Sequence, residues 1–342
     1  MKAAVLREIG QPLVVTDVPI PDIGELDVLV KVHTCGICRT DIHIQDGLAY
    51  VPALPHIPGH EPAGVIAKTG AGVKGFAVGQ RVVPHLFVAS GDCRFTRAGQ
   101  HAQAQSLHGI IGVTLPGGFA EYVRVPARNL LALPNSVPFD IGGLTSCAVI
   151  TAVHAFRKVD LGENNLAVVV GAGGIGLMLI QLLTGAGVRT IAVSRSAKSL
   201  ELARQAGAVL ALPIDAPETT RRIRDLARDD KDGADCVFEM VGLASTMKAA
   251  AEYVMRCGTI LVVGEEPEFP AIDTIQIAQR ELQIIGSRNG GLQDAQDAID
   301  FLARRAIRPL IAAKFPLERI NEALDVVRRG HAHGRVIVEL ST

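Results

Sequence analysis

The chain has 342 residues, of which 48% are hydrophobic and 20% charged, and its formal net charge at pH 7 is −1. This length exceeds one ordinary hydrophobic core and predicts two domains, while the near-neutral charge argues against nucleic acid or an anionic membrane as partner. Six cysteines are too few for a disulfide scaffold of this length, and the start, MKAAVLREIG, lacks the apolar core of a signal peptide. We therefore expect a cytoplasmic protein with reduced cysteines.

Short β-type runs broken by glycine and proline fill the first 130 residues, including 27–32, 63–70, 80–88 and 119–126. Prolines recur throughout this region, and they interrupt both helices and the interior of regular sheets. The pattern predicts an irregular, mostly antiparallel β region rather than helices.

Residues 34–43 of this region read TCGICRTDIH, and the pair Cys35 and Cys38 allows three interpretations. It can be a redox disulfide, half of a structural zinc knuckle, or one metal ligand beside an incidental cysteine. A redox pair needs a βαβ context, which an all-β region lacks, and a knuckle needs a second cysteine pair at a suitable distance. Further along, the chain offers Gly59-His60-Glu61 and an isolated Cys147 instead.

Apolar strands alternate with helical segments from about residue 150 to residue 285, beginning with LAVVV at 166–170. This alternation indicates βαβ units around a buried parallel sheet. The first strand leads directly into Gly171, Gly173 and Gly176, spaced G-x-G-x-x-G and followed by a helical pattern. Such glycines permit a tight turn, a close approach to a pyrophosphate and close helix–strand packing, so we predict a dinucleotide site.

The second strand of the alternating region ends at Ser194, where an NAD-selective site usually carries Asp or Glu for the ribose hydroxyl. Arg195 and Lys198 follow it, and a guanidinium can bind a 2′-phosphate through two hydrogen bonds. We therefore favour NADP, the alternative being that Arg195 is a solvated surface charge and that NAD is used. The last fifty residues predict two helices and a final strand, which we expect to pair back with the amino-terminal region.

Four motifs occur in the order found in zinc-dependent alcohol dehydrogenases of the medium-chain dehydrogenase/reductase superfamily: TCGICRTDIH, GHEPAGVI, SCAVITAVHAF and GAGGIG. The chain resembles this family over essentially its whole length. The resemblance implies that Cys38, His60 and Cys147 bind a catalytic zinc, with the fourth position left for water or substrate. It also implies that Glu61 is an alternate ligand, that Asp41 orients the histidine ligand, and that Cys35 is a buried bystander.

The same resemblance implies a proton relay in which Thr40 takes the substrate proton and His43 passes it outward. It further implies cofactor contacts for six more residues. These are Arg39 and Arg335 at the pyrophosphate, Thr151 and Ile175 at the nicotinamide ring, and Gly174 and Val263 elsewhere in the site.

The chain departs from the family where many members hold a second zinc with four cysteines. Only Cys93 remains of that set, because Ser90, Thr96 and Ala104 occupy the other three places, so we predict no structural zinc. Scattered histidines nearby (His85, His101 and His108) are better explained as loop residues. Ala49 and Leu86 fall where large aromatics narrow the pocket of small-alcohol enzymes, which favours longer or cyclic substrates.

The prediction is an α/β chain with two domains. A mostly β, GroES-like catalytic domain comprises 1–148 and 287–342, and a Rossmann domain with a doubly wound parallel sheet comprises 149–286. We expect reversible hydride transfer between a primary or secondary alcohol and NAD(P), one zinc per subunit, and a homodimer or homotetramer. The alternatives are a zinc-free quinone or enoyl reductase of the same superfamily, which lacks these ligands, and a non-catalytic dinucleotide-binding protein.

Overall fold

Two units divide the chain in the computed structural model, which describes residues 1–48, 50, 52–229, 231–330 and 332–340. Unit 1 comprises Met1–Ile150, Gly290–Arg305 and Pro309–Thr342, and unit 2 comprises Thr151–Asn289 and Ala306–Arg308. The changes of unit after residues 150 and 289 lie two or three residues beyond the predicted domain boundaries. The short segment 306–308 joins unit 2, which the sequence did not predict.

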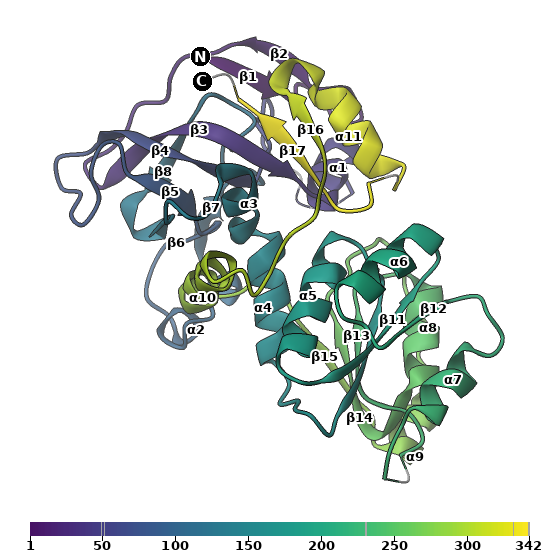
Figure 1. Ribbon diagram of the computed structural model, residues 1–342. Coiled ribbons are helices and arrows are strands. Elements are labelled where there is room, and N and C mark those ends of the chain that lie inside the picture. The colour runs from purple at the N-terminus through teal and green to yellow at the C-terminus, as the bar shows by residue number, and fades with distance from the viewer. Residues whose placement is uncertain (49, 51, 230, 331, 341–342) are drawn as a thin grey trace. The chain divides into compact units, whose positions relative to one another are not determined.

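Unit 1 is organised by a seven-stranded sheet of order β16-β17-β3-β4-β5-β9, with β8 also paired to β3 (Figure 1). All these pairings are antiparallel except that of β16 with β17, so the prediction of a mostly antiparallel region is confirmed. The strands are β3 (Asp27–Ile37), β4 (Glu61–Thr69), β5 (Arg81–Pro84), β8 (Tyr122–Pro126), β9 (Leu130–Ala132), β16 (Ile311–Pro316) and β17 (Arg335–Glu339).

The carboxyl-terminal part of the chain completes this sheet, as predicted, because β17 pairs with β3. Helix α11 (Ile320–Arg328) packs on the sheet through Ile320, Ala323 and Leu324, which are buried at the i, i+3, i+4 spacing of one helix face. Strand β16 was not predicted. Its residues alternate between half-buried and exposed at the edge of the sheet, so none of them is fully buried.

The expectation of an all-β amino-terminal region was wrong. Helix α1 (Arg39–Asp46) follows β3 directly, and Asp41 in its first turn accepts a hydrogen bond from the backbone N–H of Cys38 at 2.9 Å. The other elements of unit 1 are two small antiparallel pairs and short helices: β1 (Lys2–Val5), β2 (Val14–Asp17), β6 (Phe87–Ala89), β7 (Leu107–Ile110), α2 (Arg94–Arg97), α3 (Phe139–Gly142) and α10 (Leu292–Ala303). Four 3₁₀ turns complete it: η1 (His101–Gln103), η2 (Ala127–Asn129), η3 (Gly143–Ser146) and η4 (Leu317–Arg319).

Unit 2 is built on a six-stranded sheet of order β12-β11-β10-β13-β14-β15, in which every pairing is parallel. The strands are β10 (Leu166–Val170), β11 (Arg189–Ser194), β12 (Leu210–Pro213), β13 (Ala234–Glu239), β14 (Val254–Val262) and β15 (Gln283–Gly286). Since the strand order reverses between β10 and β13, this is the doubly wound Rossmann arrangement that was predicted. Ligands bind such sheets at the carboxyl ends of the strands where the order reverses.

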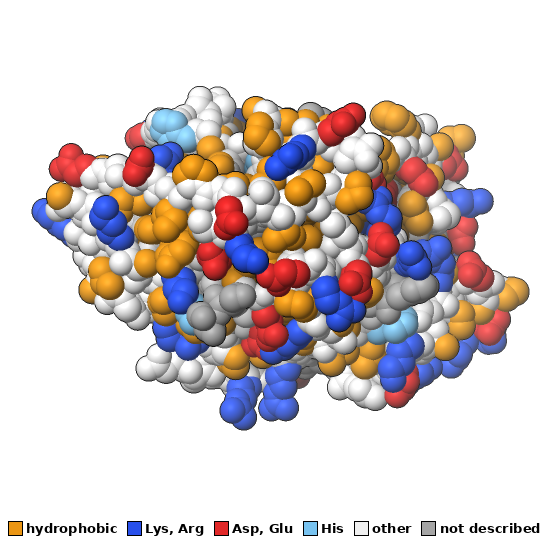
Figure 2. Space-filling model, turned by 90° about the horizontal axis from the view of Figure 1, so that it is seen from above, with side chains coloured by type: hydrophobic (Ala, Val, Ile, Leu, Met, Phe, Trp, Pro, Cys, Tyr) orange, Lys and Arg blue, Asp and Glu red, His pale blue; other side chains and the backbone are white. Residues whose placement is uncertain are grey.

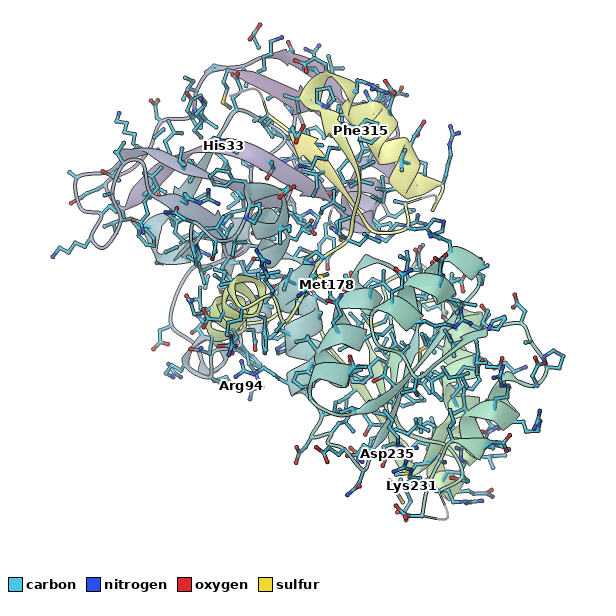
Figure 3. The ribbon with its side chains drawn as sticks, viewed as in Figure 1. His33, Arg94, Met178, Lys231, Asp235 and Phe315 are labelled. Atoms are coloured by element: carbon cyan, nitrogen blue, oxygen red, sulfur yellow. The ribbon has the colours of Figure 1, made fainter. Side chains whose placement is uncertain are left out.

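The helices of unit 2 are α5 (Gly174–Gly185), α6 (Ala197–Gln205), α7 (Thr219–Asp225), α8 (Ala244–Tyr253) and α9 (Thr274–Arg280); α4 (Ala148–Arg157) begins in unit 1 and continues into unit 2. The start of β10 is held by Asp235, which accepts hydrogen bonds from the Asn165 side chain and the Leu166 backbone and pairs with Lys231 at 2.8 Å (Figure 3). Strand β12, whose four residues are LALP, was not predicted.

On the face of the molecule shown in Figure 2, acidic and basic side chains are interspersed with apolar ones. Within the described part of the chain, no single helix is long and apolar enough to cross a bilayer. One bent pair, Phe139–Ser146 with Ala148–Arg157, meets the criterion of length and composition alone.

Candidate metal centre and dinucleotide turn

Three separate segments of unit 1 bring the predicted metal ligands together. Cys38 stands between β3 and α1, His60 directly precedes β4, Glu61 is the first residue of β4, and Cys147 follows η3. The antiparallel pairing of β3 with β4 places Gly36 opposite Glu61, and η3 contacts both strands. One ligand atom from each of Cys38, His60, Glu61 and Cys147 lies within 4.8 Å of the others. The sheet and one turn therefore assemble a cluster from residues more than 100 positions apart.

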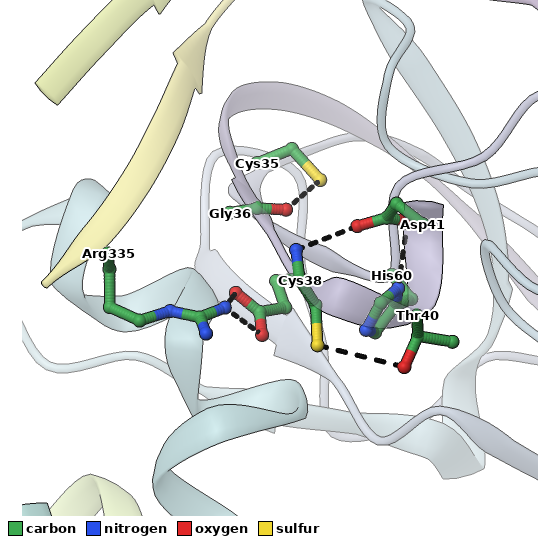
Figure 4. A network of polar contacts seen from close by, with 8 residues as sticks. Cys35, Gly36, Cys38, Thr40, Asp41, His60 and Arg335 are labelled. Carbon is green, nitrogen blue, oxygen red and sulfur yellow. Dashed lines mark hydrogen bonds and ion pairs between the residues drawn. The ribbon is translucent and has the colours of Figure 1, made fainter. Parts of the chain in front are cut away.

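The imidazole of His60 is oriented by Asp41 (Figure 4). Nδ1 lies 3.0 Å from Asp41 Oδ1, and both side chains are almost fully buried. Nε2 of His60 is buried and has no hydrogen-bond partner among the described residues. Burial opposes the charged imidazolium, but Asp41 and Cys38 outweigh it and raise the pKa of His60. A carboxylate on Nδ1 with an unpaired Nε2 is the arrangement in which histidine binds a metal ion.

The buried Cys38 and the half-buried Cys147 form a thiol pair in which one thiolate is favoured. A hydrogen bond with Cys147 lowers the pKa of Cys38 well below its usual value, against the effect of burial and with further help from His60. The same hydrogen bond, together with burial, raises the pKa of Cys147. The thiolate is the form of cysteine that binds metals, so the lowered pKa of Cys38 favours the binding of a metal cation by this pair.

Glu61 is fully buried and bound by Arg335 (Figure 4). Both carboxylate oxygens accept hydrogen bonds from Nη2 of Arg335 at 2.6 Å. Burial raises the pKa of Glu61 to about 7, although Arg335 opposes this rise. Burial also opposes the charge of Arg335, but Glu61, Cys38 and Cys147 outweigh it and raise its pKa. In this structure the guanidinium of Arg335 binds Glu61. Its contact with a cofactor pyrophosphate stays a prediction.

These residues fit a tetrahedral zinc ion. Two cysteine sulfurs and one histidine nitrogen are the donors of a catalytic zinc site that keeps one position open, and the unpaired Nε2 of His60 faces this cluster of donors. Cys35 lies outside the cluster: its thiol is buried and contacts the Gly36 carbonyl at 3.6 Å. No ligand from the described residues is needed beyond the set that was predicted.

The residues of the predicted proton relay lie on α1. The Thr40 hydroxyl is 3.7 Å from the Cys38 sulfur and is half-buried. His43 is buried and stands three residues after Thr40, so the two side chains share one face of the helix. The predicted relay therefore begins beside a predicted metal ligand.

The glycine turn of unit 2 has the features that close approach of a phosphate requires. Gly171 has a φ of +102°, a conformation that side chains disfavour. A Cβ on Gly176 would lie 2.1 Å from the Gly171 carbonyl oxygen, whereas beside Gly173 the space is open. Gly174 and Ile175 form the first turn of α5, whose amino terminus therefore faces open space.

The end of β11 contains the residues predicted to select the cofactor. Ser194 is the last residue of the strand, and Arg195 after it is exposed, with no hydrogen bond or ion pair to the residues the structure describes. Lys198 forms an exposed ion pair with Glu201 at 2.9 Å. A guanidinium beside a strand end that lacks a carboxylate is suited to a phosphate.

Three further predicted cofactor residues lie in different segments of the chain. Val263 follows β14, and its backbone N–H donates to the Glu239 carbonyl at 2.8 Å. Thr151 is buried in α4. Arg39 is exposed and donates to the Arg328 carbonyl at 3.3 Å. Their contacts with a cofactor stay predictions.

Hydrogen bonds organise the loop where many family members bind a second zinc. The Thr96 hydroxyl accepts from the Cys93 backbone at 2.8 Å, and Arg97 pairs with Asp92 at 2.7 Å. His85 is buried against the Gly290 carbonyl at 3.1 Å, and burial lowers its pKa to about 4. His101 lies edge-on to His85 with 5.7 Å between ring centroids, and His108 is exposed.

The substrate pocket is defined only in part. Leu86 is buried, and Ala49 lies outside the described residues. A pocket of about 1190 Å³ in unit 1, lined by residues such as Val73, Phe76, Leu115 and Tyr122, contains none of the predicted site residues. It therefore does not define the substrate of the metal centre.

Two family models match the two parts of the chain. The model of the alcohol dehydrogenase GroES-like domain matches residues 24–135, and the model named zinc-binding dehydrogenase matches residues 174–304. The first match contains Cys38, His60 and Glu61, and the second begins at α5 beside the glycine turn.

Relatives align over nearly the whole chain. It is 31% identical over 342 residues to an alcohol dehydrogenase of Geobacillus stearothermophilus, with 99% of this chain and 100% of that protein covered. It is 27% identical to an NAD-dependent alcohol dehydrogenase of Sulfolobus acidocaldarius, with 100% of both covered. A solved zinc-binding dehydrogenase of Sinorhizobium meliloti 1021, bound to NADP, is 30% identical, with 99% and 98% covered and a TM-score of 0.89.

Proposed function

Because the chain belongs to the zinc-dependent alcohol dehydrogenase family, we propose that it transfers hydride reversibly between a primary or secondary alcohol and NAD(P). The observation that carries this proposal is the cluster of Cys38, His60, Glu61 and Cys147, with ligand atoms within 4.8 Å and His60 oriented by Asp41. A zinc-free reductase has no use for such a set of donors.

In this proposal Cys38, His60 and Cys147 hold one zinc ion, and Glu61 is an alternate ligand when substrate is absent. Zinc supplies Lewis acidity, which lowers the pKa of a coordinated hydroxyl toward neutrality, and nicotinamide supplies the hydride acceptor. The protein's own part is to hold the imidazole of His60 in one tautomer through Asp41 and to exclude water from the buried cluster.

Two side chains of α1 carry the proton of the alcohol away from the cluster. The Thr40 hydroxyl lies beside Cys38 and is placed to accept the proton, while His43 on the same helix face passes it outward. Histidine suits this step because one of its two ring nitrogens can accept a proton while the other releases one.

The dinucleotide lies on the turn of Gly171, Gly173 and Gly176, with Gly174, Ile175, Thr151, Val263, Arg39 and Arg335 as further contacts. We propose NADP as the preferred form. Ser194 stands where NAD-selective sites have a carboxylate, which would repel the 2′-phosphate, and Arg195 is exposed directly after Ser194. The relatives differ in this respect: one is named NAD-dependent, and the solved neighbour holds NADP.

We also propose that the protein assembles as a homodimer or homotetramer, works in the cytoplasm, holds no structural zinc and uses units 1 and 2 as its catalytic and Rossmann domains. Light scattering with the purified chain tests the assembly, and metal analysis tests the zinc stoichiometry. One equivalent of zinc per subunit is expected; two equivalents would contradict the prediction for the loop around Cys93.

A substrate panel tests the function directly. Linear, branched and cyclic alcohols, with the matching aldehydes and ketones, are assayed with NAD(H) and NADP(H), each with and without a zinc chelator. Turnover of longer or cyclic alcohols that chelation abolishes is expected. Activity on quinones or activated double bonds that survives chelation, with less than about a tenth of an equivalent of zinc, would favour the zinc-free reductase. Dinucleotide binding without turnover anywhere in the panel would favour a binding protein.

A further inference from the structure

A buried carboxylate that the proposed mechanism does not use lies at the centre of unit 2. Glu239 is the last residue of β13 and is fully buried. It pairs with Val170 of β10 on one side and with Val262 of β14 on the other. Since Val170 directly precedes Gly171, Glu239 lies beside the glycine turn, where the strand order reverses.

The carboxylate is bound by the backbone of the turn that follows it. Its Oε1 accepts from the N–H groups of Val241 and Gly242, each at 3.0 Å, and its Oε2 accepts from Gly242 at 2.9 Å. A buried charge is costly unless it is hydrogen-bonded, and hydrogen bonds to charged groups are stronger than neutral ones. The side chain of Glu239 therefore fixes the course of residues 240–242.

Residues 240–242 in turn contact the glycine turn. A Cβ on Gly171 would lie 2.7 Å from Cγ2 of Val241, so the Val241 side chain fills the space beside Gly171. On the other side, a Cβ on Gly264 would lie 2.2 Å from the Gly242 nitrogen. The loop that contains Gly264 is also bound to Glu239, because the backbone N–H of Gly264 donates to the Glu239 carbonyl at 3.1 Å.

Three backbone segments, which follow β10, β13 and β14, are thus packed together without room for a side chain. Glu239 bonds two of them and, through Val241, supports the third. An apolar residue at 239 would leave the buried N–H of Gly242 and the part-buried N–H of Val241 without the acceptor that the Glu239 side chain provides.

We propose that Glu239 is a positioning residue for the dinucleotide, which holds residues 240–242 against Gly171 so that the cofactor surface is formed before the cofactor binds. The inference rests on the proposed function, because it assumes that the glycine turn binds NAD(P). Preorganisation of this kind contributes to affinity by removing the ordering that binding would otherwise require.

Dinucleotide affinity and local backbone protection test the proposal. NADPH and NADH are titrated into the dinucleotide-free wild-type protein and into the Glu239→Ala and Glu239→Gln variants, with fluorescence as the readout. In a second experiment, hydrogen exchange is measured at the backbone amides of residues 240–242. Loss of the buried acceptors in Glu239→Ala should raise the Kd at least about tenfold and speed exchange at these amides. Glu239→Gln conserves the size of the side chain and one acceptor oxygen, so the Kd should rise about two- to fivefold.

Val237→Ala is the matched control, because Val237 lies in the same strand, is fully buried and does not bind the turn. It should lower stability and leave the Kd unchanged. Equal affinity of wild type and Glu239→Ala, or an equal loss in Val237→Ala, would overturn the inference and leave the proposed function standing. Wild-type protein that binds neither dinucleotide would overturn both. If Glu239→Ala does not fold, unchanged affinity and exchange in Glu239→Gln decide against the inference.

Discussion

Asp41 shows how one carboxylate can position two predicted metal ligands at once. One oxygen lies 3.0 Å from Nδ1 of His60, and the other accepts the backbone N–H of Cys38 at 2.9 Å. The first contact fixes the imidazole tautomer, and the second fixes where α1 begins. The contact of Asp41 with His60 was predicted only from the family resemblance. The hydrogen bond from the Cys38 backbone to Asp41 was not predicted.

We expect Asp41→Asn to lower zinc affinity about 10- to 100-fold, because loss of a carboxylate that orients a histidine ligand has an effect of this size. Competition with a chromophoric chelator measures the affinity. Asp92→Asn, in an exposed ion pair with Arg97, is the control and should bind zinc as the wild type does. Unchanged affinity in Asp41→Asn would show that the contact does not support the metal.

Ser194 is the residue at which cofactor choice can be tested with one change. A carboxylate in Ser194→Asp should repel a 2′-phosphate and accept the ribose hydroxyl of NAD, so the ratio of kcat/KM for NADP to that for NAD should fall about tenfold or more. Ser194→Asn has the same size without the charge and should cause a smaller change. An unaltered ratio in the charged variant would rule out this strand end as the selective element.

At the scale of elements, α11 fastens the carboxyl-terminal strands to the sheet of unit 1. Leu324 is 2% exposed and belongs to the core cluster of that unit. Leu324→Ala should lower the free energy of unfolding by about 2–5 kcal/mol, the usual cost of such a truncation in a packed core. Chemical denaturation measures the loss. Asp325→Ala changes the exposed neighbour and should be close to neutral; similar losses in both variants would mean that burial is not the cause.

The network at the start of β10 predicts a pH dependence. Burial opposes the charge of Asp235, but hydrogen bonds from Lys231, Leu166 and Asn165 outweigh it and hold its pKa below the ordinary 3.8. A lowered folded-state pKa stabilises the fold above the ordinary value, and this stability is lost as the pH falls through the folded-state pKa. The wild type should therefore exceed Asp235→Asn in urea resistance at pH 7, and the difference should shrink below pH 3.8.

The exposed pair of Asp225 and Arg221 provides the comparison for this experiment. Asp225→Asn should change stability little at any pH, because surface pairs are screened by solvent. A constant difference between wild type and Asp235→Asn down to pH 2.5 would show that the charge of Asp235 is not responsible.

The elements that could be predicted from sequence are those with strong local signals. LAVVV at 166–170 is a continuous apolar run that ends at a glycine turn, and it became β10 as expected. In contrast, β16 was missed because its sequence IAAKFP contains two alanines, a lysine and a proline, which are poor strand formers, and α1 was missed because prolines around it indicated β structure. Tertiary contacts decided both cases: pairing with β17 for β16, and the Asp41 contacts for α1.

The same distinction applies to the site. The resemblance of four motifs to the family predicted Cys38, His60 and Cys147 as ligands, and the fold does bring these three residues together. The pairing of Glu61 with Arg335 joins residues 274 positions apart and has no local signature. The bonds of Glu239 were likewise invisible, because a glutamate at the end of a strand gives no sign of burial.

At the scale of the whole molecule, removal of zinc should have two consequences. Turnover should be lost, and the Tm should fall, because an ion that binds only the folded state stabilises it by mass action. Differential scanning calorimetry with and without chelator, followed by zinc readdition, measures the second effect. The Cys35→Ser variant is the control, because the Cys35 thiol lies outside the cluster. Its turnover and its Tm should depend on zinc as those of the wild type do. A Tm insensitive to chelation in a protein shown to contain zinc would contradict this prediction.

The return of the chain to unit 1 after unit 2 has a consequence for biosynthesis. The sheet of unit 2 uses a continuous segment, Leu166–Gly286, whereas β3 must wait for Arg335–Glu339 before its neighbour β17 exists. Domains fold as units during translation, so on the ribosome the middle of this protein can be finished while its beginning is still open. The ends of β3 and α1, where Cys38 stands, are enclosed only after the residues of β17 have been synthesised.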